Sequence, residues 1–330
     1  MSGAILAIES SCDDSCAAVL AADGSILSNI ISSQGIHDRY GGVVPEIAAR
    51  HHLTLLTPTI ETALDQANLT LEAIKRVAVT QGPGLIGALL VGVGHAKAIV
   101  AARGIGLVAV DHLQGHVAAN FISPDPFEPP FVCLIASGGH TLLARVDDHS
   151  SYSLLGETLD DAAGEAFDKG ARMLGLPFPG GPALEKLAAT GDSSAFDFPT
   201  ARNVKGLDFS FAGVKTALLY AIRDLGEDEA KRQRANLAAS YQQAIVDALL
   251  DRLTRALELS GIDRAAIGGG VAANGPLRER VSELGATTHI PARNLCTDNA
   301  AMIASAARFL PDCSAAAALA LDAYPSGARR

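Results

Sequence analysis

The chain has 330 residues, of which 48% are hydrophobic and 19% charged, so it is long and apolar enough to bury two cores. This composition excludes a disordered chain, and the formal net charge of −10 argues against a protein that coats nucleic acid nonspecifically. No apolar run approaches the ~20 residues of a membrane span, and the first residues lack a signal peptide's basic region. The five cysteines are an odd number without a CxxC spacing, which indicates reduced thiols. We therefore expect a cytoplasmic α/β enzyme with two domains.

The first third of the chain predicts a three-stranded meander followed by alternating helices and strands. The expected strands cover residues 4–9, 16–21, 26–33, 77–80 and 106–110. The expected helices cover residues 45–68 and the segment from the Gly82-Pro83-Gly84 turn to about residue 103. A polar turn that contains Asp13 and Asp14 separates the first two strands.

The same order of elements begins again at about residue 131. The expected strands cover residues 131–136, 140–146, 152–157 and 265–267, and the expected helices cover about residues 160–174 and 236–259. The last helix should begin after Asp298, which is predicted to be its N-cap. Two halves that each start with a hairpin around a polar turn suggest an internal duplication. Each half predicts a mixed sheet with helices on its faces, and both polar turns would line a cleft.

The most diagnostic local feature is a pair of histidines, His112 and His116. Side chains four residues apart on a helix project from one face, so both rings can reach one metal ion, although two polar surface histidines explain the spacing equally well. Leu113 stands where the HExxH motif of metallopeptidases has its glutamate, so the usual peptidase base is missing. A third ligand should be a carboxylate or histidine distant in sequence. Asp298 is a candidate, with the simple N-cap role favoured at this point.

Glycine-rich turns follow two predicted strands of the second half. Ser137-Gly138-Gly139 lets backbone N–H groups approach a phosphate, although any hairpin can use such glycines. Gly268-Gly269-Gly270 can accept the flat face of a purine, with Asn274 bonding ribose or base. Asp168 and Glu185 flank a Pro-Gly-Gly-Pro loop at residues 179–182, which is also suited to a ribose or base. Asp13 and Asp14 occupy the matching turn of the first half, where they either shape the turn or position a metal or water.

The run GPGLIG at residues 82–87 formally matches the GxGxxG fingerprint of dinucleotide-binding proteins, with Asp111 at a suitable offset. That fingerprint normally opens its domain, whereas three strands and a helix precede this one. Asp111 also directly precedes the histidine pair and would have to serve two sites. The glycines are therefore better explained by close packing of a helix on the sheet, and the absence of GxxxxGK[ST] excludes a P-loop at the motif level.

A series of motifs occurs in unbroken order from residue 5 to about residue 309. They are ESSCDD (9–14), GGVVPE (41–46), GPGLIG (82–87), the histidine pair, SGGH (137–140), DAAGEAFDK (161–169), LDFSF (207–211), GGGV (268–271) and CTDN (296–299). This set closely resembles the bacterial TsaD family, the tRNA adenosine threonylcarbamoyltransferases once described as O-sialoglycoprotein endopeptidases. The tail from about residue 311 lacks the Arg-x-x-Trp-Pro-Leu-like ending of bacterial members.

The resemblance implies a duplicated actin-like (ASKHA) fold whose domains face a nucleotide-binding cleft. The first domain is expected at residues 1–120 plus 295–330, and the second at residues 121–294. It also implies one divalent metal ion, iron(II) before zinc(II), bound by His112, His116 and Asp298. A threonylcarbamoyl-adenylate would be held by second-domain residues, which are Ile135, Ala136, Ser137, Gly138, Gly139, Asp168, Gly181, Glu185 and Asn274. Archaeal and eukaryotic relatives have a metal-binding tyrosine at the position of Ile135, so its absence implies an open coordination position.

The implied reaction transfers threonylcarbamoyl from threonylcarbamoyl-AMP to the exocyclic amine of the adenosine beside the anticodon, in tRNAs that read ANN codons. Asp13 is the candidate catalytic residue that orients or deprotonates this amine. The implied partners are tRNA, a TsaB-like paralogue and a TsaE-like ATPase, with no membrane. The negative charge predicts that tRNA docks on a partner subunit or on a restricted basic patch, for which the candidates are Arg202, Lys205 and Lys215. A metal-dependent glycoprotease and an ATP-binding regulatory or chaperone-like ASKHA protein remain as alternatives.

Overall fold

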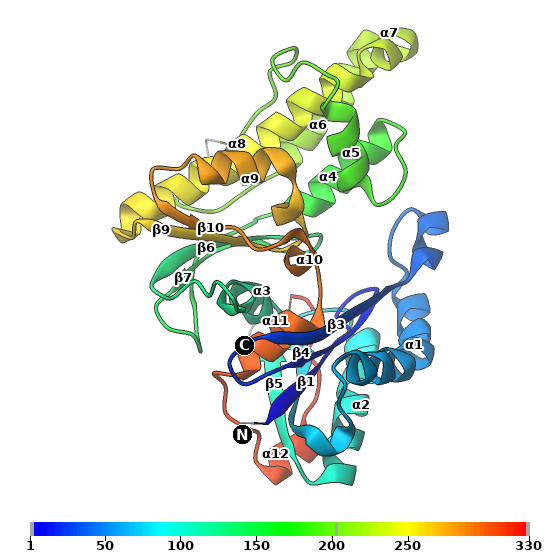
Figure 1. Ribbon diagram of the computed structural model, residues 1–330. Helices are drawn as coiled ribbons and strands as arrows, with labels where there is room; N and C mark the ends of the chain where they lie inside the picture. Colours follow the sequence, from blue (N-terminus) through cyan, green and yellow to red (C-terminus); the bar gives the residue numbers. More distant parts are fainter. Residues whose placement is uncertain (1–2, 202–203, 328–330) are drawn as a thin grey trace. The chain divides into compact units, whose positions relative to one another are not determined.

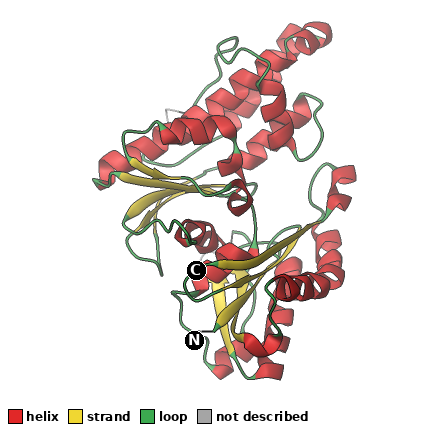
Figure 2. Cartoon of the chain, viewed as in Figure 1, coloured by secondary structure: helices red, strands yellow, loops and turns green. Residues whose placement is uncertain are grey.

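The computed structural model describes residues 3–201 and 204–327, which belong to two compact units. The first unit comprises Met1–Glu128, Asp148–Ser151 and Asp298–Arg330, and the second comprises Pro129–Asp147 and Tyr152–Thr297. Figure 1 labels the elements of each unit along the chain. Each unit contains a five-stranded mixed sheet with helices packed on it, as the sequence predicts (Figure 2).

The sheet of the first unit has the strand order β3-β2-β1-β4-β5. Its strands are β1 (Ala4–Glu9), β2 (Asp14–Leu20), β3 (Ile26–Ser33), β4 (Ile74–Gly82) and β5 (Gly106–Asp111). The first three strands form an antiparallel meander, and β4 and β5 continue from β1 in parallel. Five of the six residues of β1 are buried, because helices cover both faces of the sheet.

The helices of the first unit lie on opposite faces of this sheet (Figure 1). They are α1 (Pro45–Gln66), α2 (Ile86–Arg103), α3 (His112–Ala118), α11 (Ala300–Ala307) and α12 (Ala315–Ala320). Leu56 and Ile60 of α1 and Val93 of α2 share a core with Leu6 and Ile8 of β1. The helices α3 and α11 pack together on the other face, and this arrangement brings the segment before α11 to the histidine pair.

The sheet of the second unit has the order β8-β7-β6-β9-β10, which repeats the topology of the first. Its strands are β6 (Phe131–Ala136), β7 (Thr141–Val146), β8 (Ser153–Glu157), β9 (Arg264–Gly268) and β10 (Thr287–His289). The meander β6-β7-β8 is antiparallel, whereas β9 and β10 run parallel to β6. The expected internal duplication is thus visible in the strand order of both units.

The helices of the second unit surround a core that contains Leu134, Phe167, Tyr241 and Ile245. They are α4 (Ala163–Met173), α5 (Gly180–Ala188), α6 (Ala212–Leu225), α7 (Glu227–Arg232), α8 (Arg234–Ser260), α9 (Gly275–Ser282) and α10 (Arg293–Cys296). The phenol of Tyr241 donates a hydrogen bond of 2.8 Å to the Ala166 carbonyl oxygen, so the longest helix, α8, is fixed to α4.

The prediction that Asp298 caps the last helix is wrong. The side chain of Asn299 caps α11 instead, accepting a hydrogen bond of 3.0 Å from the Met302 N–H. The helix α11 is also not the last, because α12 follows after a short connection. An alanine-rich helix of six residues gives little apolar periodicity, so the sequence did not signal it.

The C-terminal tail runs beside the loop that follows β4. The Tyr324 N–H donates to the Gln81 carbonyl at 3.1 Å, and the Ser326 N–H donates to the Gly84 carbonyl at 3.2 Å. The Tyr324 hydroxyl lies 2.8 Å from the Gly82 carbonyl oxygen and also hydrogen-bonds Asp111. The tail therefore fixes the loop after β4 and the residue that precedes α3.

Helix α2 has the length and hydropathy of a membrane-spanning helix. A core helix of a protein that does not span a membrane passes the same test of length and composition. About a quarter of that span (28%) is buried within the structure. Its remaining apolar residues include Ile86 and Leu90, both of which are exposed. This helix packs on α1 and β4, as a helix of a layered domain does.

Candidate metal centre and glycine-rich turns

His112, His116 and Asp298 lie together in the first unit, with one ligand atom of each within 4.8 Å of the others. Asp298 Oδ1 is 3.6 Å from His112 Nε2 and 3.3 Å from His116 Nε2. The two imidazole rings have centroids 4.7 Å apart, because both project from one face of α3. Two imidazoles and a carboxylate are a donor set for zinc or iron.

Local interactions of α3 explain why these three side chains meet. Asp111 caps the helix by accepting hydrogen bonds from the N–H groups of Leu113 and Gln114. Gly115 lies against α11, where an added Cβ would be 2.6 Å from Ile303 Cδ1. The small residue allows α3 to approach α11 closely, and Asp298 precedes α11 by two residues. Asp111 therefore caps α3, which accounts for an acidic residue at the position where a dinucleotide-binding protein would have its ribose-binding carboxylate.

The two histidines differ in their hydrogen bonding. Both ring nitrogens of His116 are buried and make no hydrogen bond among the described residues, although Nε2 lies near Asp298. An imidazole with orphaned nitrogens is costly to bury, and a metal ligand would remove that cost. The residues present therefore fit a metal ion.

His112 is held by the buried carboxylate of Glu9, for which the sequence alone predicted no role. Glu9 Oε2 lies 3.0 Å from His112 Nδ1, and Glu9 is fully buried at the end of β1. Burial alone would lower the pKa of His112, but the charges of Glu9 and Asp298 and the hydrogen bond to Glu9 raise this pKa to about 9. A glutamate that ends an otherwise apolar strand was the available signal for this role.

The turn of Asp13 and Asp14 lies near the same cluster. The Cys16 thiol at the start of β2 donates to the Asp298 carbonyl oxygen at 3.8 Å, and nearby Asp13 and Asp298 contribute to a raised pKa of Cys12 beside burial. Burial also raises the pKa of Asp14 to about 6, with further contributions from Asp298 and Asp13 against a hydrogen bond from Ser33. Asp14 can therefore hold a proton close to neutral pH, which was not predicted.

In the second unit, two glycine-rich loops follow neighbouring parallel strands. Ile135 of β6 pairs with Gly268 of β9, so the loops after both strands begin at the same edge of the sheet. The Ser137 N–H donates to the His140 carbonyl, and the His140 N–H donates to Ser137 Oγ. The side chain of Ile135 is fully buried and Ala136 nearly so. The expected phosphate turn is thus a well-ordered hairpin.

The turn at Ser137–Gly139 is closed on one side by helix α4. The Gly164 N–H donates to the Ser137 carbonyl at 3.0 Å, and an added Cβ on Gly164 would lie 2.6 Å from that oxygen and 2.8 Å from the Gly138 nitrogen. By contrast, an added Cβ on Gly138 or Gly139 would meet no atom within 4 Å. One side of the turn is therefore open to a ligand.

The remaining predicted site residues form hydrogen-bonded pairs. Asp168 Oδ1 accepts a bond of 2.8 Å from the Gly180 N–H at the start of α5, next to Gly181. Burial raises the pKa of Asp168, while the N–H groups of Gly180 and Gly181 act against this rise.

Glu185 and Asn274 meet at the start of α9. Glu185 Oε1 accepts from the Gly275 N–H at 3.0 Å, and the Asn274 amide donates to Glu185 Oε2 at 3.2 Å. The same Asn274 amide donates to Gln242 Oε1 at 2.9 Å, and its oxygen caps α9 by accepting from the Leu277 N–H. Gln242 on α8 is a member of this network that sequence reasoning missed, because nothing in a helical pattern marks one glutamine.

The candidate basic patch carries less unpaired positive charge than its residue types suggest, because Lys215 is paired with a carboxylate. Lys215 Nζ forms an ion pair of 2.5 Å with Asp161, and Lys169 pairs with the other oxygen of the same carboxylate at 2.7 Å. Lys205 is exposed, and Arg202 lies outside the described residues.

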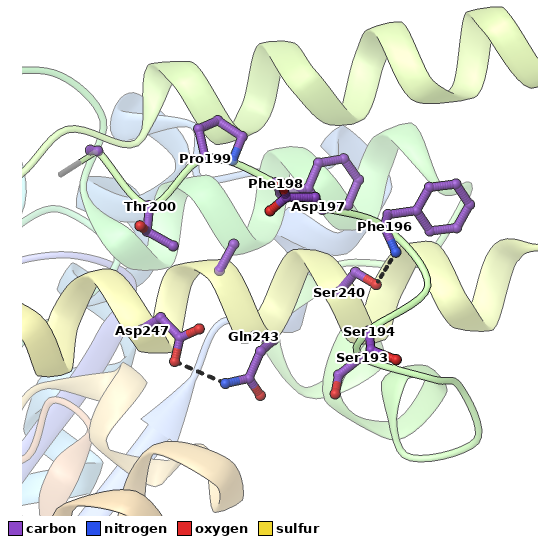
Figure 3. A pocket seen from close by; sticks show the side chains of 12 residues that line it. Ser193, Ser194, Phe196, Asp197, Phe198, Pro199, Thr200, Ser240, Gln243 and Asp247 are labelled. Carbon is purple, nitrogen blue, oxygen red and sulfur yellow. Dashed lines mark hydrogen bonds between the residues drawn. The ribbon is translucent and has the colours of Figure 1, made fainter. Parts of the chain in front are cut away.

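A separate cavity of about 510 Å³ lies between the segment at residues 193–201 and α8 (Figure 3). Ser240 Oγ accepts from the Phe196 N–H at 3.1 Å beside it, and Gln243 donates to Asp247 at its rim. None of the predicted site residues lines this cavity.

Comparison with known proteins gives concordant results. The family model for TsaD, tRNA N6-adenosine threonylcarbamoyltransferase, matches residues 25–305. The chain is 50% identical to the curated tRNA N6-adenosine threonylcarbamoyltransferase of Symbiobacterium thermophilum (strain DSM 24528 / JCM 14929 / IAM 14863 / T), over 98% of this chain and 96% of that protein. It is 47% identical to the protein of the same name from Clostridium novyi (strain NT), with the same two coverages.

Solved structures with 14–15% sequence identity share the fold. Component A of the Acidaminococcus fermentans (R)-2-hydroxyglutaryl-CoA dehydratase has a TM-score of 0.55 over 92% of this chain and 95% of that chain. HypF of T. kodakarensis has a TM-score of 0.62 over 92% of this chain and 47% of that chain. These similarities confirm the actin-like (ASKHA) fold expected from the sequence.

Proposed function

The chain belongs to the tRNA N6-adenosine threonylcarbamoyltransferase family, and from this premise we propose its donor, its metal and the roles of its residues. The enzyme is a transferase that forms threonylcarbamoyladenosine in tRNA. The donor proposed is threonylcarbamoyl-AMP, and the acceptor is the exocyclic amine of the adenosine beside the anticodon in tRNAs that read ANN codons. The observation that carries this proposal is 50% identity to a curated transferase over 98% of the chain, together with a cluster of three possible metal ligands within one unit.

The glycine-rich loops of the second unit are proposed to hold the adenylate. The open side of Gly138 and Gly139 leaves room for a phosphate against backbone N–H groups beside Ile135, Ala136 and Ser137. Asp168, with Gly181 next to it, and the pair of Glu185 and Asn274 carry polar groups suited to ribose and base. Because the mixed anhydride is already activated, the chain mainly has to orient its donor and acceptor and stabilise developing charge.

His112, His116 and Asp298 are proposed to hold one divalent metal ion, iron(II) first and zinc(II) as the alternative. Such an ion, when bound, would act as a Lewis acid toward a carboxylate or carbonyl oxygen of the donor. The buried imidazoles and the lack of a hydrogen bond to His116 among the described residues support a cation that takes nitrogen ligands.

Asp13 is proposed to orient or deprotonate the attacking amine. It lies in the turn beside the metal cluster, next to Asp14, whose carboxyl can take up a proton near neutral pH because burial raises its pKa to about 6. The variants Asp13→Asn and Asp14→Asn, compared in the same assay, separate these roles. A loss of turnover in Asp13→Asn alone would support Asp13 as the residue that orients or deprotonates the amine. Normal turnover of Asp13→Asn would show that Asp13 does not have this role.

The TsaB-like partner is proposed to dock on the outer surface of α1 and α2. Leu53, Ile86 and Leu90 are 62%, 43% and 46% exposed, which leaves an apolar surface over two helices. These helices lie side by side, since Thr57 Oγ1 is 3.3 Å from His95 Nε2. A TsaE-like ATPase is the second proposed partner, and the cytoplasm is the proposed location. Lys205 and Arg202 are proposed tRNA contacts, whereas Lys215 is already paired with Asp161.

An acceptor assay tests the function as a whole. The reaction contains the chain, its partner subunits, synthetic threonylcarbamoyl-AMP and an unmodified tRNA that reads an ANN codon. After incubation the tRNA is digested, and its nucleosides are analysed by mass spectrometry. A tRNA with another anticodon family is the matched control. Threonylcarbamoyladenosine in the first tRNA alone, with equimolar AMP, is the expected result. Hydrolysis of ATP or of a glycoprotein without modified nucleoside would contradict the proposal.

A further inference from the structure

Glu9 is a fully buried carboxylate at the end of a strand whose other residues are apolar. A buried carboxylate is stable only where donors satisfy its oxygens. Oε1 accepts from the Ser11 N–H at 2.5 Å, and Oε2 accepts from Thr80 Oγ1 at 2.6 Å. His112 Nδ1 provides the remaining contact at 3.0 Å. Three donors from three different segments thus hold this carboxylate in one orientation.

This contact sets the state of the His112 ring. In the neutral ring that a metal ion requires, a carboxylate that has already accepted two hydrogen bonds favours the proton on the facing Nδ1, which places the lone pair on Nε2. Nε2 is also the nitrogen that lies 3.6 Å from Asp298 Oδ1. Ser11 Oγ, at 3.2 Å from the same Nδ1, adds a second polar group on that side.

Neither nitrogen of His116 makes a hydrogen bond in the part of the chain that the structure describes, and its near carboxylate, Asp298, lies at Nε2 and not at Nδ1. The two histidines are therefore unequal: Nδ1 of His112 faces a buried carboxylate, whereas the polar contact of His116 is Nε2 with Asp298 at 3.3 Å. Carboxylate–histidine pairs of the first kind orient metal ligands and raise their basicity.

We propose that Glu9 is a positioning residue of the metal centre, which fixes the His112 ring with Nε2 toward the ion, and that Thr80 fixes Glu9 in turn. This proposal rests on the proposed metal site of His112, His116 and Asp298. It assigns a role to a residue that is outside the proposed set of metal ligands and lies more than 100 positions from the ring it orients.

The same sheet offers a matched control. Ser15 Oγ on β2 is 2.7 Å from Nδ1 of His52, whose Nε2 lies 3.0 Å from the Cys12 carbonyl oxygen. Ser15 and His52 are both fully buried, so Ser15→Ala removes a buried hydrogen bond to a histidine that is not in the metal cluster. A variant that only loses a buried hydrogen bond should therefore behave like Ser15→Ala, with a lower Tm and an unchanged metal affinity.

The experiment measures the affinity of the full chain for Zn²⁺ and Co²⁺ by competition with a chromophoric chelator. The variants are Glu9→Gln, Thr80→Val, Thr80→Ser, Ser15→Ala and His112→Ala, and the Tm of each is measured with EDTA. Glu9→Gln is expected to weaken metal binding about 10- to 100-fold and to change the Co²⁺ absorption spectrum. Thr80→Val should weaken metal binding less than Glu9→Gln does. Thr80→Ser keeps the hydroxyl and should bind metal as the native chain does, and Ser15→Ala should also leave the metal affinity unchanged.

Two results would overturn the inference in distinguishable ways. If Glu9→Gln and Thr80→Val lower the Tm in EDTA but bind metal with unchanged affinity, Glu9 only holds β1 to β4. If His112→Ala also binds metal with unchanged affinity, the proposed metal site itself is wrong. Thr80→Val keeps the test decisive should Glu9→Gln fail to fold, because it leaves the carboxylate in place.

Discussion

At the scale of single residues, the first unit collects more negative than positive charge around its two cluster histidines. Burial raises the pKa of the Asp14 carboxyl to about 6, and the charges of Asp298, Asp13 and Glu9 add to this rise. Like charges close together in a buried place disfavour one another's ionised forms. A divalent cation in this place would offset the repulsion, which agrees with the donor set of the cluster.

Asp14→Asn should therefore stabilise the metal-free protein in a pH-dependent way. The folded-state pKa of about 6 exceeds the ordinary value of 3.8, so the folded protein binds more protons between these values. The native chain should lose stability as the pH rises from 3.8 to about 6 and should then stay level, whereas the variant should show no such loss. Urea unfolding in EDTA should show little difference at pH 4 and a gain of about 2–3 kcal/mol for the variant at pH 7.5. A loss of the same size at every pH would contradict this account.

At the scale of elements, the positions of the loops depend on close helix packing. The start of α4 covers one side of the Ser137–Gly139 turn, where the Gly164 N–H bonds the Ser137 carbonyl. The contact atoms around Gly164 are backbone atoms, which cannot move away by a rotamer change. The shape of the turn is thus set by a residue in the following helix.

Gly164→Ala should destabilise the protein by about 1–3 kcal/mol and weaken the binding of AMP, the probe for the adenylate site. Gly94→Ala on α2 is the matched control, since an added Cβ there meets no atom within 4 Å. In that open helical position alanine should stabilise by about 0.5–1 kcal/mol. Urea unfolding and calorimetric titration with AMP measure both effects. Equal stability and AMP affinity for the two variants would show that the α4 contact does not shape the turn.

At the scale of the whole molecule, the sequence predicted the features that depend on local patterns. The meanders, the long helices and the i, i+4 histidine pair all follow from periodicity and turn residues, and the structure contains them. The contacts of Glu9 with His112 and of Asn274 with Gln242 join segments far apart in the chain, so no local pattern encodes them. The N-cap of α11 is Asn299 and not Asp298. Asp and Asn have about equal capping propensity, so the sequence could not distinguish these two adjacent residues.

The proposed partner surface makes a prediction about assembly. The double variant Leu53→Glu/Leu90→Glu should bind the purified TsaB-like subunit at least about tenfold more weakly, because charged groups would replace the apolar centre of the interface. Leu259→Glu on α8, which is 73% exposed, is the control and should bind normally. Analytical ultracentrifugation gives the affinities. Normal binding of the double variant would place the partner elsewhere.

The measurement that tests the central claim most directly compares two adjacent substitutions, Asp298→Asn and Asn299→Ala. Metal content is determined by mass spectrometry, and threonylcarbamoyladenosine formation is measured in the acceptor assay. Asp298→Asn should lose the metal and the product, with little change in the Tm measured in EDTA, where the native protein is also metal-free. Asn299→Ala, which removes the cap of α11, should lose about 1 kcal/mol of stability and keep both. An Asp298→Asn enzyme with native metal content and a native rate would contradict a metal-dependent transferase built on this cluster.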